Sequence, residues 1–177
     1  MKLLAVDTSG PVCGVAILTE DGIRHECAVM NHKTHSVNLL PMIDNAFQST
    51  GLTIQDMDRL AVVVGPGSFT GVRLGVSTVK GLAHGAGKPC VAVNALEAMA
   101  AGISGFSGVV CPIQDARAGQ VYGAAFSAGE NRPNRLMADT PMKVEDYVAE
   151  ISRFGDRFLF LGDGMSVHCL LYTSPSP

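Results

Sequence analysis

The order of hydrophobic patterns in the N-terminal half restricts the possible folds more than any other feature of this sequence. Three short apolar runs come first, and turn residues such as Glu20-Asp21-Gly22 separate them, which predicts three consecutive antiparallel strands. Apolar residues then recur at helical spacing, with further short apolar runs between the helices. The predicted elements are strands over 2–6, 12–18, 23–30, 60–64 and 89–93 and helices over 36–51, 70–86 and 95–101.

A hairpin sheet extended by parallel strands with crossover helices is the arrangement of one lobe of the ribonuclease H or actin type. After the linker-like stretch 102–108 the pattern starts again. The elements expected there are strands over 109–113, 121–126 and 157–161 and a helix over 144–154. We therefore predict an α/β protein of the actin-like ATPase (ribonuclease H-like) fold, with two related lobes of which the second is truncated.

The lobes are expected over 1–105 and 106–168, followed by a non-native or disordered tail over 169–177. This tail ends in two Ser-Pro pairs and has too few apolar residues to offset the entropy of ordering it. The five cysteines are widely spaced without a Cys-x-x-Cys pair, which is typical of reduced core thiols in a cytosolic protein. We find no signal-peptide pattern and no apolar run long enough for a membrane span, so we expect a cytoplasmic protein.

Residues 65–75 read GPGSFTGVRLG and form a glycine-rich loop between a predicted strand and a predicted helix. The loop lacks the Gly-Lys-Ser/Thr ending of a Walker motif and the glycine spacing of a dinucleotide fingerprint. Ser68 or Thr70 is a candidate helix cap. The helix that follows contains four glycines, at 71, 75, 81 and 85, and each lowers helix stability by up to about 1 kcal/mol relative to alanine. Three explanations remain open: packing on the protein's own sheet, a helix contact between subunits, or anion binding at the helix N-terminus.

The helix expected over 36–51 has two apolar stripes. One contains Val37, Leu40, Ile43 and Phe47 and is expected to face the core. The other contains Leu39, Met42 and Ala46. Because one stripe suffices for a surface helix, the second stripe indicates a second partner.

Four segments together closely resemble the bacterial TsaB family, formerly YeaZ. They are the N-terminal KLLAVDTS, the segment 35–41, the loop GPGSFTGVRLG, and Asp115-Ala116-Arg117 followed by Val121-Tyr122. The resemblance extends from residue 1 to about 168 and implies the actin-like ATPase fold. It also implies a non-catalytic subunit of the machinery that makes N6-threonylcarbamoyladenosine in tRNA.

The resemblance further implies that the chain pairs with the catalytic paralogue TsaD, that the ATPase TsaE joins the complex, and that tRNA is contacted only through that complex. The first two helices of the N-terminal lobe would form the contact, and an isolated chain could pair with itself through the same faces. The residues expected to bind the partner are Leu39, Met42, Ala46, Gly71, Val72, Gly75 and Val79.

The metal motif of the catalytic paralogue, of Asn-His-Leu-Glu-Gly-His type, corresponds here to Asn94-Ala95-Leu96-Glu97-Ala98-Met99. Ala95 and Met99 occupy both histidine positions, and neither side chain suits a hard or borderline divalent ion. His32 and His35 lie on a predicted loop without further ligands nearby, so we expect solvated loop histidines and no metal site.

Asp7, Thr8 and Ser9 follow the first strand, where actin-like kinases keep a metal or phosphate aspartate. They are either weak nucleotide-binding residues or ordinary turn residues. An ATP-dependent kinase of this superfamily is therefore one alternative function. A peptidase-like hydrolase using Ser68 is another, but the sequence offers no convincing base for it. We expect this chain to bind no cofactor of its own, with ATP used by the complex.

Overall fold

The computed structural model describes residues 1–30, 35–127, 129 and 132–166. His32, Cys169 and the tail predicted over 169–177 lie outside the described residues. The chain divides into two compact units, Met1–Asn94 and Ala95–Pro177. The division falls earlier than the expected boundary after residue 105. The reason is that helix α3 (Ala95–Ala101) packs on strands of the second unit.

The first unit contains a five-stranded sheet in the order β3-β2-β1-β4-β5. Its strands are β1 (Leu3–Asp7), β2 (Cys13–Thr19), β3 (Gly22–Val29), β4 (Arg59–Val63) and β5 (Cys90–Val93). The first three strands pair antiparallel, β1 pairs parallel with β4, and β4 pairs parallel with β5. This pairing is the predicted hairpin sheet with its parallel extension.

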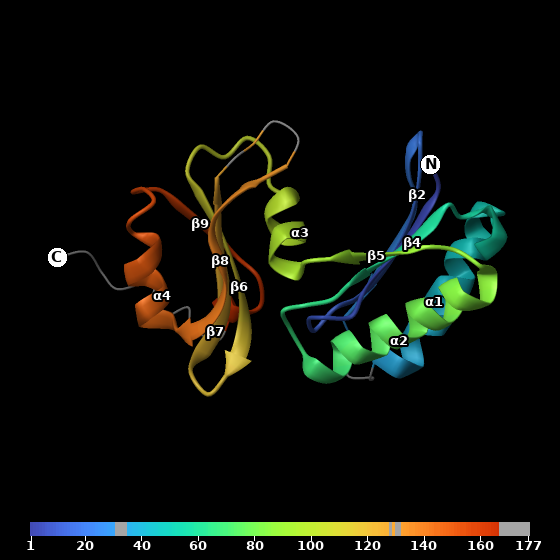
Figure 1. Cartoon of the computed structure of the whole chain (residues 1–177), viewed down its shortest axis with the longest axis horizontal. Coiled ribbons are helices and arrows are strands. Elements are labelled where there is room, and N and C mark those ends of the chain that lie inside the picture. The colour runs from blue at the N-terminus through green and yellow to red at the C-terminus, as the bar shows by residue number, and fades with distance from the viewer. Residues whose placement is uncertain (31–34, 128, 130–131, 167–177) are drawn as a thin grey trace. The chain divides into compact units, whose positions relative to one another are not determined.

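Two helices cover one face of this sheet, α1 (His35–Thr50) and α2 (Phe69–Ala86), as Figure 1 shows. A short 3₁₀ turn, η1 (Ile54–Asp56), leads from α1 into β4. Alternate strand residues such as Leu4 and Val6 point toward the helices and are buried with Leu39 and Val79 in one core. Helices on this face fix the positions of the loops that connect them to the strand ends.

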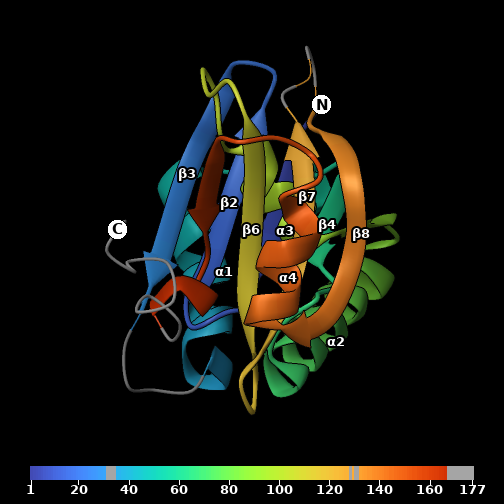
Figure 2. The same ribbon diagram turned by 90° about the vertical axis from the view of Figure 1, so that its left-hand side faces the viewer.

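The second unit has a four-stranded sheet in the order β8-β7-β6-β9. Its strands are β6 (Val109–Arg117), β7 (Gln120–Ser127), β8 (Asn134–Lys143) and β9 (Phe158–Leu161). Helix α4 (Val144–Ile151) packs on one face, as Figures 1 and 2 show, and α3 packs on the other. The β6 strand pairs antiparallel with β7 and parallel with β9, just as β1 pairs with β2 and β4.

The second sheet therefore repeats the first, which confirms the predicted actin-like ATPase (ribonuclease H-like) fold with two related lobes. Within 95–127, 129 and 132–166, the second unit has no strand that corresponds to β5.

Strand β8 is absent from the sequence-based prediction, which had no element between the strand ending at 126 and the helix beginning at 144. The strand lies at the edge of its sheet, and among the described residues it pairs only with β7, so its outer side has no ladder partner there. Pro141 lies within it, which an edge strand tolerates because no neighbour needs the missing N–H donor. An exposed edge strand has little hydrophobic alternation, so the pattern gave no signal. No described helix combines the length and the apolar character needed to cross a bilayer.

Candidate functional site

The glycine-rich loop connects the end of β4 to α2 and lies against the turn that follows β1. The Ser68 N–H donates to the Ser9 carbonyl oxygen at 2.7 Å. The Ser68 hydroxyl accepts a hydrogen bond from the Gly71 N–H at 3.3 Å, so Ser68 is the predicted N-cap of α2. Gly67 has a φ of 152° and abuts the Ser9 backbone, leaving no room for a side chain.

Thr8 fills the space beside the first two turns of α2. Its hydroxyl donates to the Gly71 carbonyl oxygen at 2.7 Å. A Cβ at Gly71 would overlap the Thr8 carbonyl oxygen, and a Cβ at Gly75 would overlap the Thr8 hydroxyl. Of the three explanations left open for these two glycines, the structure supports packing on the protein's own sheet.

Ser9, in the turn after β1, also makes its hydrogen bonds within the chain. Both the N–H and the hydroxyl of Ser9 donate to Asp7 Oδ1, at 2.8 and 2.7 Å. Thr8 and Ser9 are fully buried, at 0% and 1% exposure. The structure thus brings the three residues considered for nucleotide binding together with the glycine loop. The hydroxyl groups of Thr8 and Ser9 donate to acceptors within the protein.

Helix α1 faces the sheet with the whole stripe predicted to contact a partner and with only half of the stripe predicted to face the core, namely Ile43 and Phe47. Leu39, Met42 and Ala46, expected to contact a partner, are buried in the unit's own core together with Ile43. Val37 and Leu40, expected to face the core, are each 56% exposed. The helix therefore does present apolar residues to solvent, but they belong to the other stripe.

Four other predicted partner-binding residues lie on α2, and the same correction applies to three of them. Gly71, Gly75 and Val79 are buried against the sheet. Val72 is half-buried and lines a shallow hollow of about 550 Å³ along the helix.

We define the outer surface of α2 by Phe69, Arg73, Val76, Ser77 and Lys80. Phe69 is 69% exposed, and the Arg73 guanidinium lies 3.8 Å from the centre of its ring. Arg73, Val76, Ser77 and Lys80 also line the hollow. Further along the helix, a Cβ added at Gly81 or Gly85 would meet only open space. Sequence reasoning missed this surface, although the spacing from Phe69 through Arg73 and Ser77 to Lys80 is the helical signal for one face.

The comparisons with known proteins agree with this fold. A family model described as TsaD, tRNA N6-adenosine threonylcarbamoyltransferase, matches residues 25–171. The chain is 35% identical over 168 residues to the tRNA threonylcarbamoyladenosine biosynthesis protein TsaB of Bacillus subtilis, covering 95% of this chain and 73% of that relative. This chain belongs to the TsaB family.

A second TsaB relative, from Escherichia coli, is 39% identical over 134 residues, which is 74% of this chain and 57% of the relative. The chain therefore spans between about half and three quarters of the length of these two TsaB proteins. A solved structure from Pseudomonas aeruginosa, described as similar to the peptidase YEAZ, superposes with a TM-score of 0.84 at 26% identity. That comparison covers 99% of this chain and 81% of the other.

In this TsaB-family chain, the positions that correspond to the metal motif of the catalytic paralogue lie on α3. Ala95 is buried, and Met99 packs against the core between α3 and the second sheet. Glu97 forms an ion pair with Arg135 of β8 at 3.2 Å. Within the described ranges, no three His, Cys, Asp or Glu side chains gather in a group that could hold a metal ion.

Two further expectations need correction. His35 is not a solvated loop residue; it begins α1, is half-buried, and its Nε2 lies 2.8 Å from the Gly10 carbonyl oxygen. Cys90 is not a core thiol, since it begins β5 and is exposed. Cys13 and Cys111 are buried as predicted, and burial is the largest cause that raises the pKa of the Cys13 thiol, followed by the charge of Asp7.

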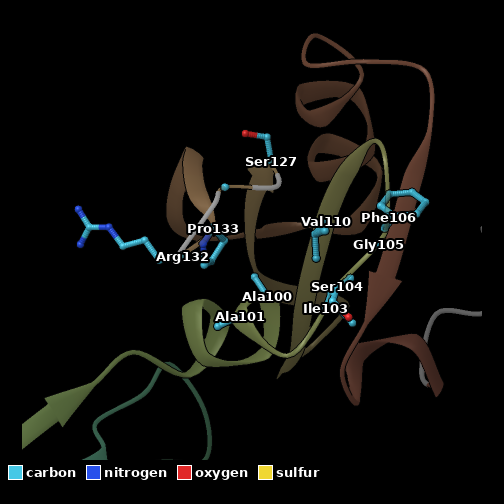
Figure 3. A pocket seen from close by; sticks show the side chains of 11 residues that line it. Ala100, Ala101, Ile103, Ser104, Gly105, Phe106, Val110, Ser127, Arg132 and Pro133 are labelled. Atoms are coloured by element: carbon cyan, nitrogen blue, oxygen red, sulfur yellow. The ribbon is translucent and has the colours of Figure 1, made fainter.

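A separate hollow of about 280 Å³ lies in the second unit (Figure 3). Ile103, Phe106 and Val110 form apolar walls, and Ser104 and Ser127 contribute hydroxyl groups. The Arg132 side chain extends away from these walls in Figure 3. Among the described residues that line this hollow there is no histidine, carboxylate or cysteine, so these residues supply no base for a serine nucleophile.

Proposed function

We propose that this chain is a non-catalytic subunit of the machinery that makes N6-threonylcarbamoyladenosine in tRNA. In this role it pairs with a paralogue of the TsaD type and acts with the ATPase TsaE in the cytoplasm. The chain itself binds no cofactor, and the complex uses the ATP. With a net charge of −3, the chain contacts tRNA only through the complex.

One observation carries the non-catalytic part of this proposal. In the turn after β1, where kinases of this fold keep a phosphate or metal aspartate, the Thr8 hydroxyl donates to Gly71 and the Ser9 hydroxyl donates to Asp7. Both hydroxyls are buried, and α2 approaches so closely at Gly75 that even a methyl group would not fit. A phosphate would have to displace these contacts. Ala95 and Met99 in place of metal ligands support the same conclusion.

The pairing part of the proposal draws on the helices that cover the first sheet. Val37 and Leu40 of α1 and Phe69 of α2 are all more than half exposed, although each is large and apolar. An exposed aromatic residue next to an arginine is a common anchor at protein interfaces. We therefore assign the partner contact to the outer surface of α2 and to Val37 and Leu40 of α1. The buried residues Leu39, Met42, Ala46 and Val79 support that surface from beneath.

The test compares two variants that each place a carboxylate on an exposed apolar position. Phe69→Asp changes the outer surface of α2, and Ile23→Asp changes strand β3, where Ile23 is 60% exposed. We expect Phe69→Asp to weaken binding to the TsaD paralogue of the same organism by about a hundredfold, as for loss of an interface anchor. Ile23→Asp should leave binding unchanged. Calorimetry measures both affinities, and circular dichroism verifies that both variants fold.

The cellular test is the threonylcarbamoyladenosine content of tRNA in a strain whose own TsaB gene is replaced by each variant. Phe69→Asp should lower this content, and Ile23→Asp should restore it. If folded Phe69→Asp binds the paralogue as well as the unchanged chain does, the assignment of the contact to α2 is wrong. Turnover of ATP by the purified chain alone would instead favour the kinase alternative.

A further inference from the structure

The outer surface of α2 carries positive charge without any compensating negative charge. Arg73 and Lys80 are exposed along it, and residues 69–86 contain no aspartate or glutamate. Among the residues that the structure describes, neither Arg73 nor Lys80 lies within ion-pairing distance of a carboxylate. The neighbouring helix α1 contributes one carboxylate, Asp44, whose Oδ2 accepts a hydrogen bond from Gln48.

The two cations lie on either side of an apolar position. Arg73 and Lys80 are seven residues apart, so they lie two helical turns and roughly 10 Å apart on the same side of α2. Val76 lies between them, and all three line the hollow of about 550 Å³. Phe69 extends the apolar part toward the start of the helix. The surface thus has two cations two turns apart, with the apolar Val76 between them and the apolar Phe69 beyond Arg73.

We propose that this surface selects its partner by charge: it accepts an amphipathic helix whose apolar residues are flanked by carboxylates two turns apart. This inference rests on the docking role proposed above and adds the chemistry of the partner helix. Complementary charges at the rim of an apolar contact raise the rate of association and exclude wrong partners. A partner helix with cations at the same positions would be rejected.

A second copy of this chain is one such wrong partner. Arg73 and Lys80 are placed symmetrically about the midpoint between Val76 and Ser77. If two copies pair through α2 across a two-fold axis at that midpoint, Arg73 of one copy faces Lys80 of the other, twice. Both contacts join like charges, which opposes self-pairing. The charges therefore favour a heterodimer over a homodimer through the same helix.

This symmetry provides a test that needs no partner. Lys80→Glu converts both like-charge contacts into Arg73–Glu pairs, so the variant should self-associate about tenfold more tightly than the unchanged chain. The double variant Arg73→Glu/Lys80→Glu restores like charges and should self-associate as weakly as the unchanged chain. Arg59→Glu makes the same charge change at an exposed position on β4 and serves as the control. Sedimentation equilibrium at low salt measures the dimer dissociation constant of each variant.

The second part of the test uses the TsaD paralogue of the same organism. Its affinity for the unchanged chain should fall as NaCl rises from about 50 to about 500 mM, as expected for screened charge pairs, and Lys80→Glu should weaken binding about tenfold. Arg59→Glu should change neither the affinity for the paralogue nor its dependence on NaCl. If Lys80→Glu binds the paralogue normally and stays monomeric while Phe69→Asp loses binding, the docking role stands and charge selection is wrong. If Phe69→Asp also binds normally, the docking role itself is wrong.

Discussion

The Thr8 hydroxyl donates a hydrogen bond of 2.7 Å to the carbonyl oxygen of Gly71, which ties the end of β1 to the first turn of α2. The glycines at 71 and 75 permit this approach, because a side chain at either position would overlap Thr8. The other two glycines of the helix, Gly81 and Gly85, have open space around them. One helix therefore contains glycines with two different roles, and substitution separates them.

Gly75→Ala should lower the free energy of unfolding by roughly 1–3 kcal/mol, because the new methyl group would overlap the Thr8 hydroxyl. Gly81→Ala is the matched control, since both glycines lie inside the same helix. It should raise the free energy of unfolding by up to about 1 kcal/mol, because alanine is the better helix former. Urea denaturation measures both. Equal effects of the two substitutions would contradict the close contact at Gly75.

The two stripes of α1 can be distinguished in the same way. Leu39→Ala should destabilise the protein by about 2–5 kcal/mol, because Leu39 is fully buried in the core of the first unit. Leu40→Ala, at the next residue, should change stability by no more than about 0.5 kcal/mol, because Leu40 is 56% exposed. Thermal unfolding followed by circular dichroism measures the difference. A larger loss of stability for Leu40→Ala than for Leu39→Ala would mean that Leu40 faces the core, as the sequence predicted.

The sequence predicted the helix over α1 but not its rotation about its axis. Both stripes contain large apolar residues at helical spacing, so hydrophobic periodicity alone cannot say which one the sheet covers. The strand order was predictable because hairpin turns and helical spacing are local signals. The role of Gly71 was not, because the atoms that it contacts belong to Thr8, 63 residues earlier in the chain. Long-range contacts of this kind leave no periodic signal.

The buried thiol of Cys111 should make stability fall at alkaline pH. Burial raises the pKa of this thiol from 9.0 to about 12, and a hydrogen bond with Tyr147 opposes the rise only in part. Between these two pH values the unfolded chain loses the thiol proton and the folded chain keeps it. The contribution of the thiol is therefore complete below about pH 9 and is lost as pH rises toward about 12.

The measurement is the urea midpoint as a function of pH for the unchanged chain, Cys111→Ala and Cys90→Ala. We expect Cys111→Ala to be less stable at neutral pH because of its cavity, but to lose less of its remaining stability above about pH 9. Cys90 is exposed, so Cys90→Ala should keep the pH dependence of the unchanged chain. Identical pH profiles for the unchanged chain and Cys111→Ala would show that the thiol titrates normally.

Thiol labelling should separate the same cysteines kinetically. Cys90 is exposed and should react rapidly with a maleimide in the folded protein, whereas Cys13 and Cys111 are buried and should react only after local or global opening. Peptide mass spectrometry at successive times measures each rate. Rapid labelling of Cys111 at neutral pH would mean that the core between α4 and the second sheet opens readily.

The isolated chain should not bind ATP through the turn that follows β1. A phosphate there would need the donors of Thr8 and Ser9, but these donate to Gly71 and to Asp7, and each hydrogen bond that must break opposes binding by about 0.5–1.5 kcal/mol. The Asp7 carboxylate would also repel the phosphate unless a metal ion lay between them. Calorimetry with Mg-ATP should therefore detect no saturable binding.

Ser9→Ala tests the turn directly, and Ser77→Ala, on the exposed side of α2, is its control. We expect Ser9→Ala to lower stability while Ser77→Ala does not, and neither to change the calorimetric trace. Saturable ATP binding that is lost in Ser9→Ala and kept in Ser77→Ala would mean that the turn opens to hold a phosphate, and the loop would then be a nucleotide site.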